Sequence, residues 1–228
     1  MNIIEKARVF ATAAHYAAGN VRKYTGEPYI NHSIAVVLLV AGVPHTPEMI
    51  AAAWLHDTVE DTKVPMQLIE REFGSEIAEL VYWLTDKSTH EDGNRAARKA
   101  IDRLHIAQAS PAAKTIKLAD LLDNTASIIE RDPDFAKVYM AEKAELLKVL
   151  TEGDKTLWDR ANLICWAWAQ PGELKQQTQE KQMSTREIFA SFIRSADNGT
   201  NAIHANRAAV LAHARRALVL AGPKGRLP

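Results

Sequence analysis

The fold is decided by the stretch Trp54-Leu55-His56-Asp57-Thr58-Val59-Glu60-Asp61-Thr62, which ends an apolar, alanine-rich segment. It places one histidine and three carboxylates within six residues. On a continuous helix, His56 and Glu60 would share one face, and Asp57 and Asp61 would share another. Burying so many ionisable groups beside apolar side chains is costly unless something pairs with them. A divalent cation would do so, and other segments should then supply the missing ligands.

Length and composition indicate one ordinary globular domain with an appendage. The 228 residues are 47% apolar and 25% charged, which provides ample material for a core. The formal net charge is zero, so the overall field favours neither nucleic acid nor membrane as a partner. The single cysteine, Cys165, excludes a disulfide framework and a cysteine zinc site, and it fits a reducing cytoplasm.

Targeting and membrane signals are not seen in the sequence. No apolar run approaches the roughly 20 residues that span a bilayer. The start, Met1-Asn2-Ile3-Ile4-Glu5-Lys6, lacks the basic-then-apolar layout of a signal peptide. We therefore expect a cytoplasmic protein.

Hydrophobic spacing predicts an all-α domain over residues 1–170, with about nine or ten helices and no strand-like alternation. Breaks at glycine and proline separate the expected helices. The expected ranges are 2–19, 32–41, 47 into the central stretch, 64–73, 76–84, 95–109, 110–130, 132–150 and 153–170.

The composition changes after residue 170. Residues 171–228 begin with a segment rich in glutamine and lysine, and helical patterns resume at 184–193 and 202–221. This part is expected to be a helical C-terminal extension of unknown role. Its apolar faces should be buried somewhere, and pairing between two chains as a homo-oligomer is one way to bury them.

Three separated segments supply candidate metal ligands. His32 follows Tyr29-Ile30-Asn31, His56-Asp57 lies in the central stretch, and Asp120 follows Lys117-Leu118-Ala119. Imidazole together with carboxylate suits Mn²⁺, Fe²⁺ or Zn²⁺. Two histidines and two aspartates would leave positions open for water and substrate. The remaining histidines lack acidic partners at ligand spacing and are interpreted as ordinary: His15, His45, His90, His105, His204 and His213.

In this order, the motifs resemble the HD superfamily of metal-dependent phosphohydrolases. More narrowly, they are similar to the hydrolase domain of RelA/SpoT homologues and to small alarmone hydrolases. The resemblance covers about residues 2–165 and includes Arg22-Lys23 and Gly26-Glu27-Pro28-Tyr29. It implies an HD-domain helical bundle with one metal ion, usually Mn²⁺ in this family. The implied ligands are His32, His56, Asp57 and Asp120.

The resemblance also implies a reaction and its residues. Glu60 and Asp61 would lie beside the metal and would position and deprotonate the attacking water. Asn124 would contact the sugar, while Arg22 and Lys23 would flank the purine base and the phosphates. The family reaction removes pyrophosphate from the 3′ position of (p)ppGpp, a small nucleotide, and leaves GDP or GTP.

The chain departs from the family pattern next to the third motif. Family members often carry basic residues after its aspartate and its asparagine, where this chain has Leu121-Leu122-Asp123 and Thr125-Ala126-Ser127. Ser127, three residues beyond Asn124, could replace a hydroxyl contact to substrate. No synthetase domain follows residue 170, so hydrolysis without synthesis is expected.

Two alternatives stay open. The same site could act on another nucleotide, such as a pppApp-like compound, a nucleoside monophosphate or NADPH, because the altered neighbours of Asp120 and Asn124 belong to the nucleotide pocket. The chain could instead be a regulatory, antitoxin-like binding protein that docks through residues 171–228. The presence of all four ligands and both acids favours an enzyme.

Overall fold

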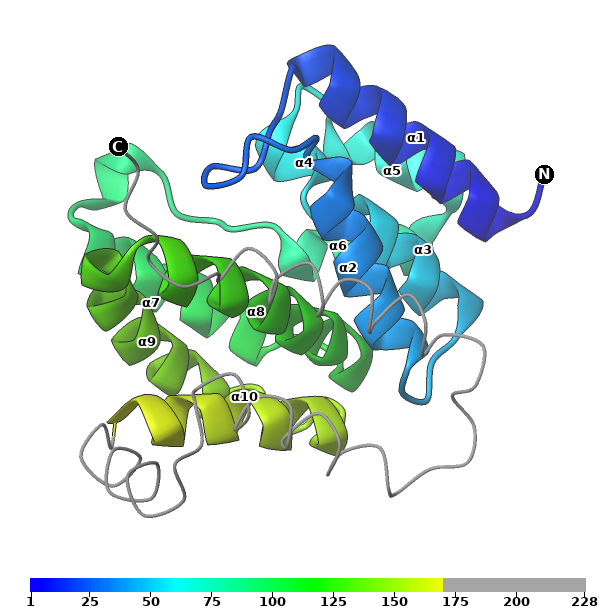
Figure 1. Cartoon of the computed structure of the whole chain (residues 1–228). Helices are drawn as coiled ribbons and strands as arrows, with labels where there is room; N and C mark the ends of the chain where they lie inside the picture. Colours follow the sequence, from blue (N-terminus) through cyan, green and yellow to red (C-terminus); the bar gives the residue numbers. More distant parts are fainter. Residues whose placement is uncertain (170–228) are drawn as a thin grey trace, which may run out of the picture. The chain divides into compact units, whose positions relative to one another are not determined.

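The computed structural model describes residues 1–169, and these residues are helical throughout apart from their loops (Figure 1). The described part contains no β-strand, only an isolated antiparallel bridge between Val21 and Pro28. The predicted all-α class is confirmed. The elements are α1 (Ile3–Ala18), α2 (Ile30–Ala41), α3 (Pro47–Leu55), α4 (Thr58–Asp61), α5 (Met66–Phe73), α6 (Ser75–Leu84), a 3₁₀ turn (His90–Asp92), α7 (Arg95–Ala107), α8 (Pro111–Arg131), α9 (Pro133–Leu147) and α10 (Lys155–Ala169).

Local signals in the sequence account for most of the helix ends. The side chains of Asn2, Thr46 and Ser110 each accept a hydrogen bond from a backbone N–H in the first turn of the helix that follows. Proline occupies the first turn of α3, α8 and α9, where its missing N–H costs nothing. Gly19 ends α1 in the left-handed conformation, with φ of 70°.

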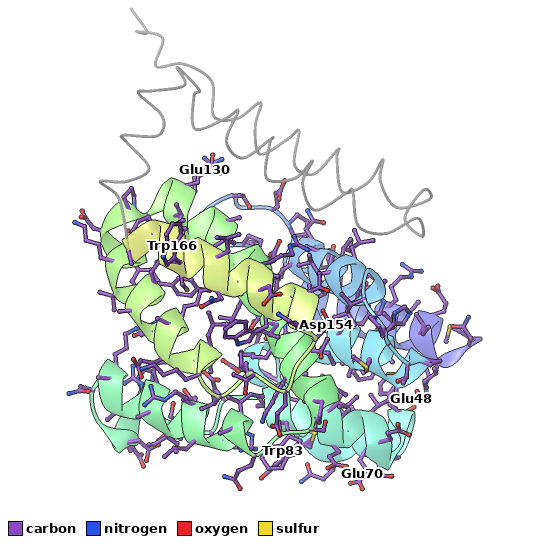
Figure 2. The ribbon with its side chains drawn as sticks, turned by 90° about the horizontal axis from the view of Figure 1, so that it is seen from below. Glu48, Glu70, Trp83, Glu130, Asp154 and Trp166 are labelled. Atoms are coloured by element: carbon purple, nitrogen blue, oxygen red, sulfur yellow. The ribbon has the colours of Figure 1, made fainter. Side chains whose placement is uncertain are left out.

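The core is built around α3. Every residue from Met49 to Leu55 is buried, and the helix packs against α1, α2 and α6. Helix α8 packs against α2, α6 and α9, so it brings its own buried face next to the end of α3. Charged side chains such as Glu70 and Glu130 lie at the periphery (Figure 2). Because α2, α3 and α8 converge, the three motif segments meet inside one compact unit, Met1–Trp168.

The central stretch is not one continuous helix, so the condition under which His56 and Glu60 would share a face is not met. Helix α3 ends at Leu55, and α4 begins at Thr58. Asp57 lies between them with φ of −99° and ψ of 0°, a conformation found at many active-site residues. Neighbouring residues on a regular helix point about 100° apart. The break lets His56 and Asp57 face the same point.

Two expectations concern membranes and the C-terminal extension. None of the helices within residues 1–169 is long and apolar enough to cross a bilayer. The helices expected in 171–228, and the homo-oligomer that they would form, lie outside the described residues and stay predictions.

Candidate active site

The residues predicted as metal ligands include a tight cluster of three. His32 lies in the first turn of α2, and His56 and Asp57 lie in the break between α3 and α4. One ligand atom from each of these side chains lies within 4.8 Å of the other two. The two histidine Nε2 atoms are 3.2 Å apart, and Asp57 Oδ2 is 2.9 Å from His56 Nε2. We call these three residues the HHD cluster.

Each histidine of the cluster has a hydrogen-bond acceptor next to its Nδ1 atom. His32 Nδ1 lies 2.6 Å from Asp123 Oδ2, and His56 Nδ1 lies 2.9 Å from the Ala53 carbonyl oxygen. Carboxylate and carbonyl oxygens only accept hydrogen bonds, so each Nδ1 donates. Each Nε2 then offers a lone pair when its ring is neutral, or carries a second proton when the ring is charged. With both rings neutral, two lone pairs would face each other beside a carboxylate, and this arrangement favours a proton or a metal ion between them.

The spacing within the cluster fits a metal ion. Two imidazole nitrogens bound to one ion at about 2.1 Å each lie roughly 3 to 3.4 Å apart, depending on the coordination angle. The observed 3.2 Å falls within this range. Burial alone would lower the pKa of His32, but hydrogen bonds to Asp120, Asp123 and Asp57 raise it well above its ordinary value. The carboxylates around the cluster therefore favour a positive charge at this position, and a divalent metal ion would provide it.

The fourth predicted ligand, Asp120, lies next to the HHD cluster. Its Oδ1 is 3.3 Å from His32 Nε2 and accepts a hydrogen bond of 2.6 Å from Asn124 Nδ2. Its Oδ2 is 2.9 Å from Lys117 Nζ. Burial opposes ionisation of Asp120, but the charge of Lys117 and the interactions with His32 together outweigh it and lower the pKa of the carboxyl. Asp120 is thus held as a carboxylate with one oxygen directed at the cluster.

The two predicted catalytic acids lie on α4 and line a cleft of about 710 Å³ beside Asp57 and Asp120. The backbone N–H of Asp86 donates to Glu60 Oε2 at 3.1 Å. Although Glu60 keeps part of its surface open to the cleft, desolvation raises its pKa to about 7, with further contributions from the charges of Asp86 and Asp57. Desolvation and the charge of Asp57 also raise the pKa of Asp61. A group that titrates near neutral pH suits proton transfer.

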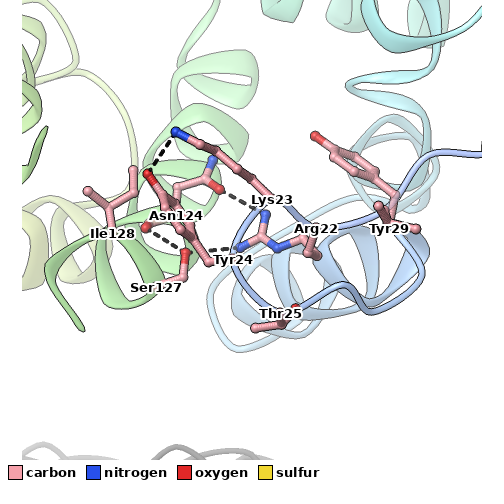
Figure 3. A pocket seen from close by; sticks show the side chains of 9 residues that line it. Arg22, Lys23, Tyr24, Thr25, Tyr29, Asn124, Ser127 and Ile128 are labelled. Atoms are coloured by element: carbon pink, nitrogen blue, oxygen red, sulfur yellow. Dashed lines mark hydrogen bonds between the residues drawn. The ribbon is translucent and has the colours of Figure 1, made fainter. Parts of the chain in front are cut away.

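The four predicted substrate-binding residues gather around a smaller pocket of about 230 Å³ (Figure 3). Arg22 and Lys23 come from the loop between α1 and α2, and Asn124 and Ser127 come from α8. Tyr29 and Asn124 line both this pocket and the cleft, so the two cavities adjoin. We call the smaller cavity the Arg22 pocket.

The Arg22 guanidinium is held in place by the chain itself. It donates to Asn124 Oδ1 at 2.9 Å, to Asp123 Oδ2 at 3.0 Å and to Ser127 Oγ at 3.4 Å, and two of these bonds are drawn in Figure 3. Most of the N–H edge of the Arg22 guanidinium is therefore used in hydrogen bonds within the chain, and its planar face remains for stacking. Lys23 is exposed, with its Nζ 4.8 Å from the centre of the Tyr24 ring.

Sequence reasoning missed two contacts. Asp123 was considered only as the site of an absent basic residue, yet its Oδ2 accepts hydrogen bonds from both His32 and Arg22. Its place three residues after Asp120, on the same helical face, was the available signal. Tyr29 was assigned no contact with an acid, yet its hydroxyl donates to Asp57 Oδ2 at 2.6 Å. Asp123 thus couples the HHD cluster to the Arg22 pocket.

Replacing Asp123 tests whether it orients His32. In Asp123→Ala, His32 loses the acceptor that fixes its Nδ1 proton, and we expect the affinity for Mn²⁺ to fall about 10- to 100-fold. Isothermal calorimetry on the purified chain measures this. Asp134→Ala is the matched control, because Asp134 is exposed on α9 and pairs only with Lys137 in the described part of the chain. An unchanged affinity in Asp123→Ala would contradict the assignment.

The raised pKa of Glu60 predicts a pH-dependent stability. A carboxyl whose pKa rises from 4.5 to about 7 on folding favours the folded state when protonated, so this contribution disappears as the pH rises through that interval. Because Glu60 is exposed and solvent screens its charge, only part of this contribution should be measurable, and Glu60→Gln should raise the melting temperature of the metal-free protein at pH 8 by about 2 °C.

The difference in melting temperature between Glu60→Gln and wild type should close below about pH 4, where Glu60 is protonated in both the folded and the unfolded chain. Thermal unfolding followed by circular dichroism measures both temperatures in the presence of a chelator. Glu79→Gln, an exposed change on α6, controls for the general loss of one charge. A difference in melting temperature that is the same at both pH values would contradict a raised pKa of Glu60 in the folded protein.

Comparison with known proteins places these features in a family. The HD domain family matches residues 7–147. A guanosine-3′,5′-bis(diphosphate) 3′-pyrophosphohydrolase of Aquifex aeolicus is 34% identical over 125 residues, 55% of this chain and 18% of that protein. A GTP pyrophosphokinase of Streptomyces coelicolor is 35% identical over 118 residues, 51% of this chain and 14% of that protein. The chain thus spans less than a fifth of the length of either relative.

A solved structure, described as a metazoan ortholog of SpoT that hydrolyses ppGpp, has a TM-score of 0.65 and 26% identity. The match covers 75% of this chain and 97% of that one. HD domains depend on divalent metal, and a His/Asp cluster suited to such an ion is present here. With its all-helical architecture and its HHD cluster, the chain belongs to the HD domain family and has the HD phosphohydrolase fold.

Proposed function

We propose that the chain is a Mn²⁺-dependent hydrolase that removes the 3′-pyrophosphate from (p)ppGpp and releases GDP or GTP. One observation carries this proposal: Asp57 of the HHD cluster lines a cleft that adjoins the Arg22 pocket at Tyr29 and Asn124. A nucleotide has the matching two parts, a base for the pocket and a phosphorylated sugar for the cleft. The relatives named as ppGpp hydrolases support this choice of substrate.

The metal would be held by His32, His56, Asp57 and Asp120. Two imidazoles and two carboxylates suit Mn²⁺ better than Mg²⁺, which prefers oxygen ligands alone. When bound, such an ion neutralises phosphoryl oxygens and lowers the pKa of water. Asn124 and Lys117 keep Asp120 in its ionised form with Oδ1 toward the cluster.

The acids on α4 would handle the proton. Glu60, with a pKa of about 7, can accept a proton from the attacking water at neutral pH and return it afterwards. The N–H of Asp86 holds one oxygen of Glu60, so the other is the proton acceptor. Asp61, on the same short helix, would orient the water by a hydrogen bond.

The Arg22 pocket would hold the nucleoside. The face of the Arg22 guanidinium, fixed by Asn124, Asp123 and Ser127, would stack on the purine base. Asn124 would contact the ribose where the pocket and the cleft adjoin, which directs the 3′ group toward the HHD cluster. Lys23, exposed at the pocket, would attract phosphates as a point charge, and Ser127 would add a hydroxyl contact.

Turnover with a panel of nucleotides tests the proposal. The purified chain with Mn²⁺ should release pyrophosphate from ppGpp and pppGpp faster than phosphates from pppApp, NADPH or a nucleoside monophosphate. His56→Ala and Glu60→Ala should each lose at least about 100-fold in kcat, because the first removes a ligand and the second a proton acceptor. His45→Ala, an exposed histidine in the loop before α3, should keep wild-type activity.

Other outcomes would revise the proposal. Fast turnover of a different nucleotide, lost in the same two variants, would retain the site and replace the substrate. Absence of turnover of any nucleotide by a metal-loaded chain would favour a regulatory binding protein. The proposal covers hydrolysis alone, so incubation with ATP and GTP should yield no (p)ppGpp.

A further inference from the structure

One histidine outside the proposed machinery is buried next to it. His15, in the last turn of α1, is 2% exposed, and its ring stacks on Tyr29 with centroids 4.7 Å apart and planes at 24°. Its Nδ1 lies 3.2 Å from Asn20 Nδ2. Its Nε2 is buried and finds no hydrogen-bond partner within the described chain. A polar atom left unpaired in the interior is costly, so the residue needs an explanation.

The hydrogen bonds of Asn20 determine the protonation of His15. Asn20 Nδ2 also donates to the main-chain oxygen of Asp61 at 2.8 Å. A carbonyl oxygen only accepts, so this side-chain atom is the NH₂ group, and its second hydrogen faces His15 Nδ1. That nitrogen must therefore accept, and His15 is a neutral imidazole with its proton on Nε2. Burial, which lowers the pKa of His15, agrees with this state.

Two arms lead from His15 to the acids of the site. Through the first, the stacked Tyr29 ring places its hydroxyl on Asp57 Oδ2 at 2.6 Å. Through the second, Asn20 holds the backbone of Asp61 at the end of α4. The arms are joined, because Tyr29 N–H donates to Asn20 O at 3.1 Å. One side chain of α1 thus supports both a proposed metal ligand and a proposed catalytic acid.

We propose that His15 is a positioning residue for the hydrolase site. Its ring supports Tyr29, which fixes Asp57, and its Nδ1 orients Asn20, which fixes the backbone of Asp61. This inference deepens the proposed function and rests on it for the role of Asp61. The effect on Asp57 concerns metal binding and is independent of which nucleotide is the substrate.

The two arms can be separated by substitution. His15→Phe keeps a ring to stack on Tyr29 but removes the Nδ1 acceptor, so kcat should fall about tenfold with Mn²⁺ affinity within about twofold of wild type. His15→Ala also removes the ring and should lower Mn²⁺ affinity about tenfold, as should Tyr29→Phe. His45→Phe is the matched control and should alter neither quantity.

A double-mutant cycle tests the Asn20 arm. Asn20→Ala should lower kcat by a factor similar to that of His15→Phe, and the double variant should lose little more, because both changes break the same hydrogen bond. If His15 and Asn20 had only a structural role, each variant would have a lower melting temperature. At temperatures where the variants are still folded, their kcat and metal affinity would be unchanged. Independent, multiplicative losses of kcat would also overturn the proposal.

Calorimetry with Mn²⁺ alone distinguishes this inference from the proposed function. If wild type fails to hydrolyse ppGpp while His15→Ala loses metal affinity and His15→Phe retains it, the proposed function fails and the ring's support of Asp57 stands. If wild type hydrolyses ppGpp and both His15 variants bind Mn²⁺ and turn over like wild type, the positioning role fails and the function stands.

Discussion

Two imidazole nitrogens that face each other at 3.2 Å set the main constraint on this structure. Each ring donates from Nδ1, in one case to Asp123 and in the other to the Ala53 carbonyl, so in the neutral form each Nε2 turns a lone pair inward. Such an arrangement is unfavourable without positive charge between the rings. The surrounding carboxylates strengthen the demand for a cation.

The helical packing follows from bringing these groups together. The proposed ligands come from α2, from the end of α3 and from the middle of α8, so these three helices must meet at one point. The apolar face of α3 supplies the necessary burial. The break at Asp57 interrupts the regular helix, and it lets the adjacent residues His56 and Asp57 both face the centre of the HHD cluster. Asp123 then extends the order of the cluster into the Arg22 pocket.

Much of this arrangement could be predicted from the sequence. Apolar spacing and the breaks at glycine and proline located most of the helices, and the three motifs named the HHD cluster and the neighbouring Asp120. Arg22, Lys23, Asn124 and Ser127 do line one pocket, although their roles remain proposals. These features were predictable because they depend on local periodicity or on a motif whose residues act together.

The remaining features depend on contacts between distant segments. The contact of Tyr29 with Asp57, the pairing of His32 with Asp123 and the stacking of His15 on Tyr29 are set by tertiary packing and have no local signature. The helix break was missed because His56 keeps helical dihedral angles and only Asp57 departs from them. His15 was judged ordinary because it lacks an acidic neighbour in sequence, whereas its partners are an asparagine and a tyrosine.

The central claim is that the HHD cluster binds one metal ion. Crystals of the full chain soaked in Mn²⁺ and measured at the manganese absorption edge would test it directly. We predict one anomalous peak, within coordination distance of His32 Nε2, His56 Nε2 and Asp57 Oδ2. A chain that crystallises with the cluster intact but shows no peak there, or shows its only peak elsewhere, would contradict the account.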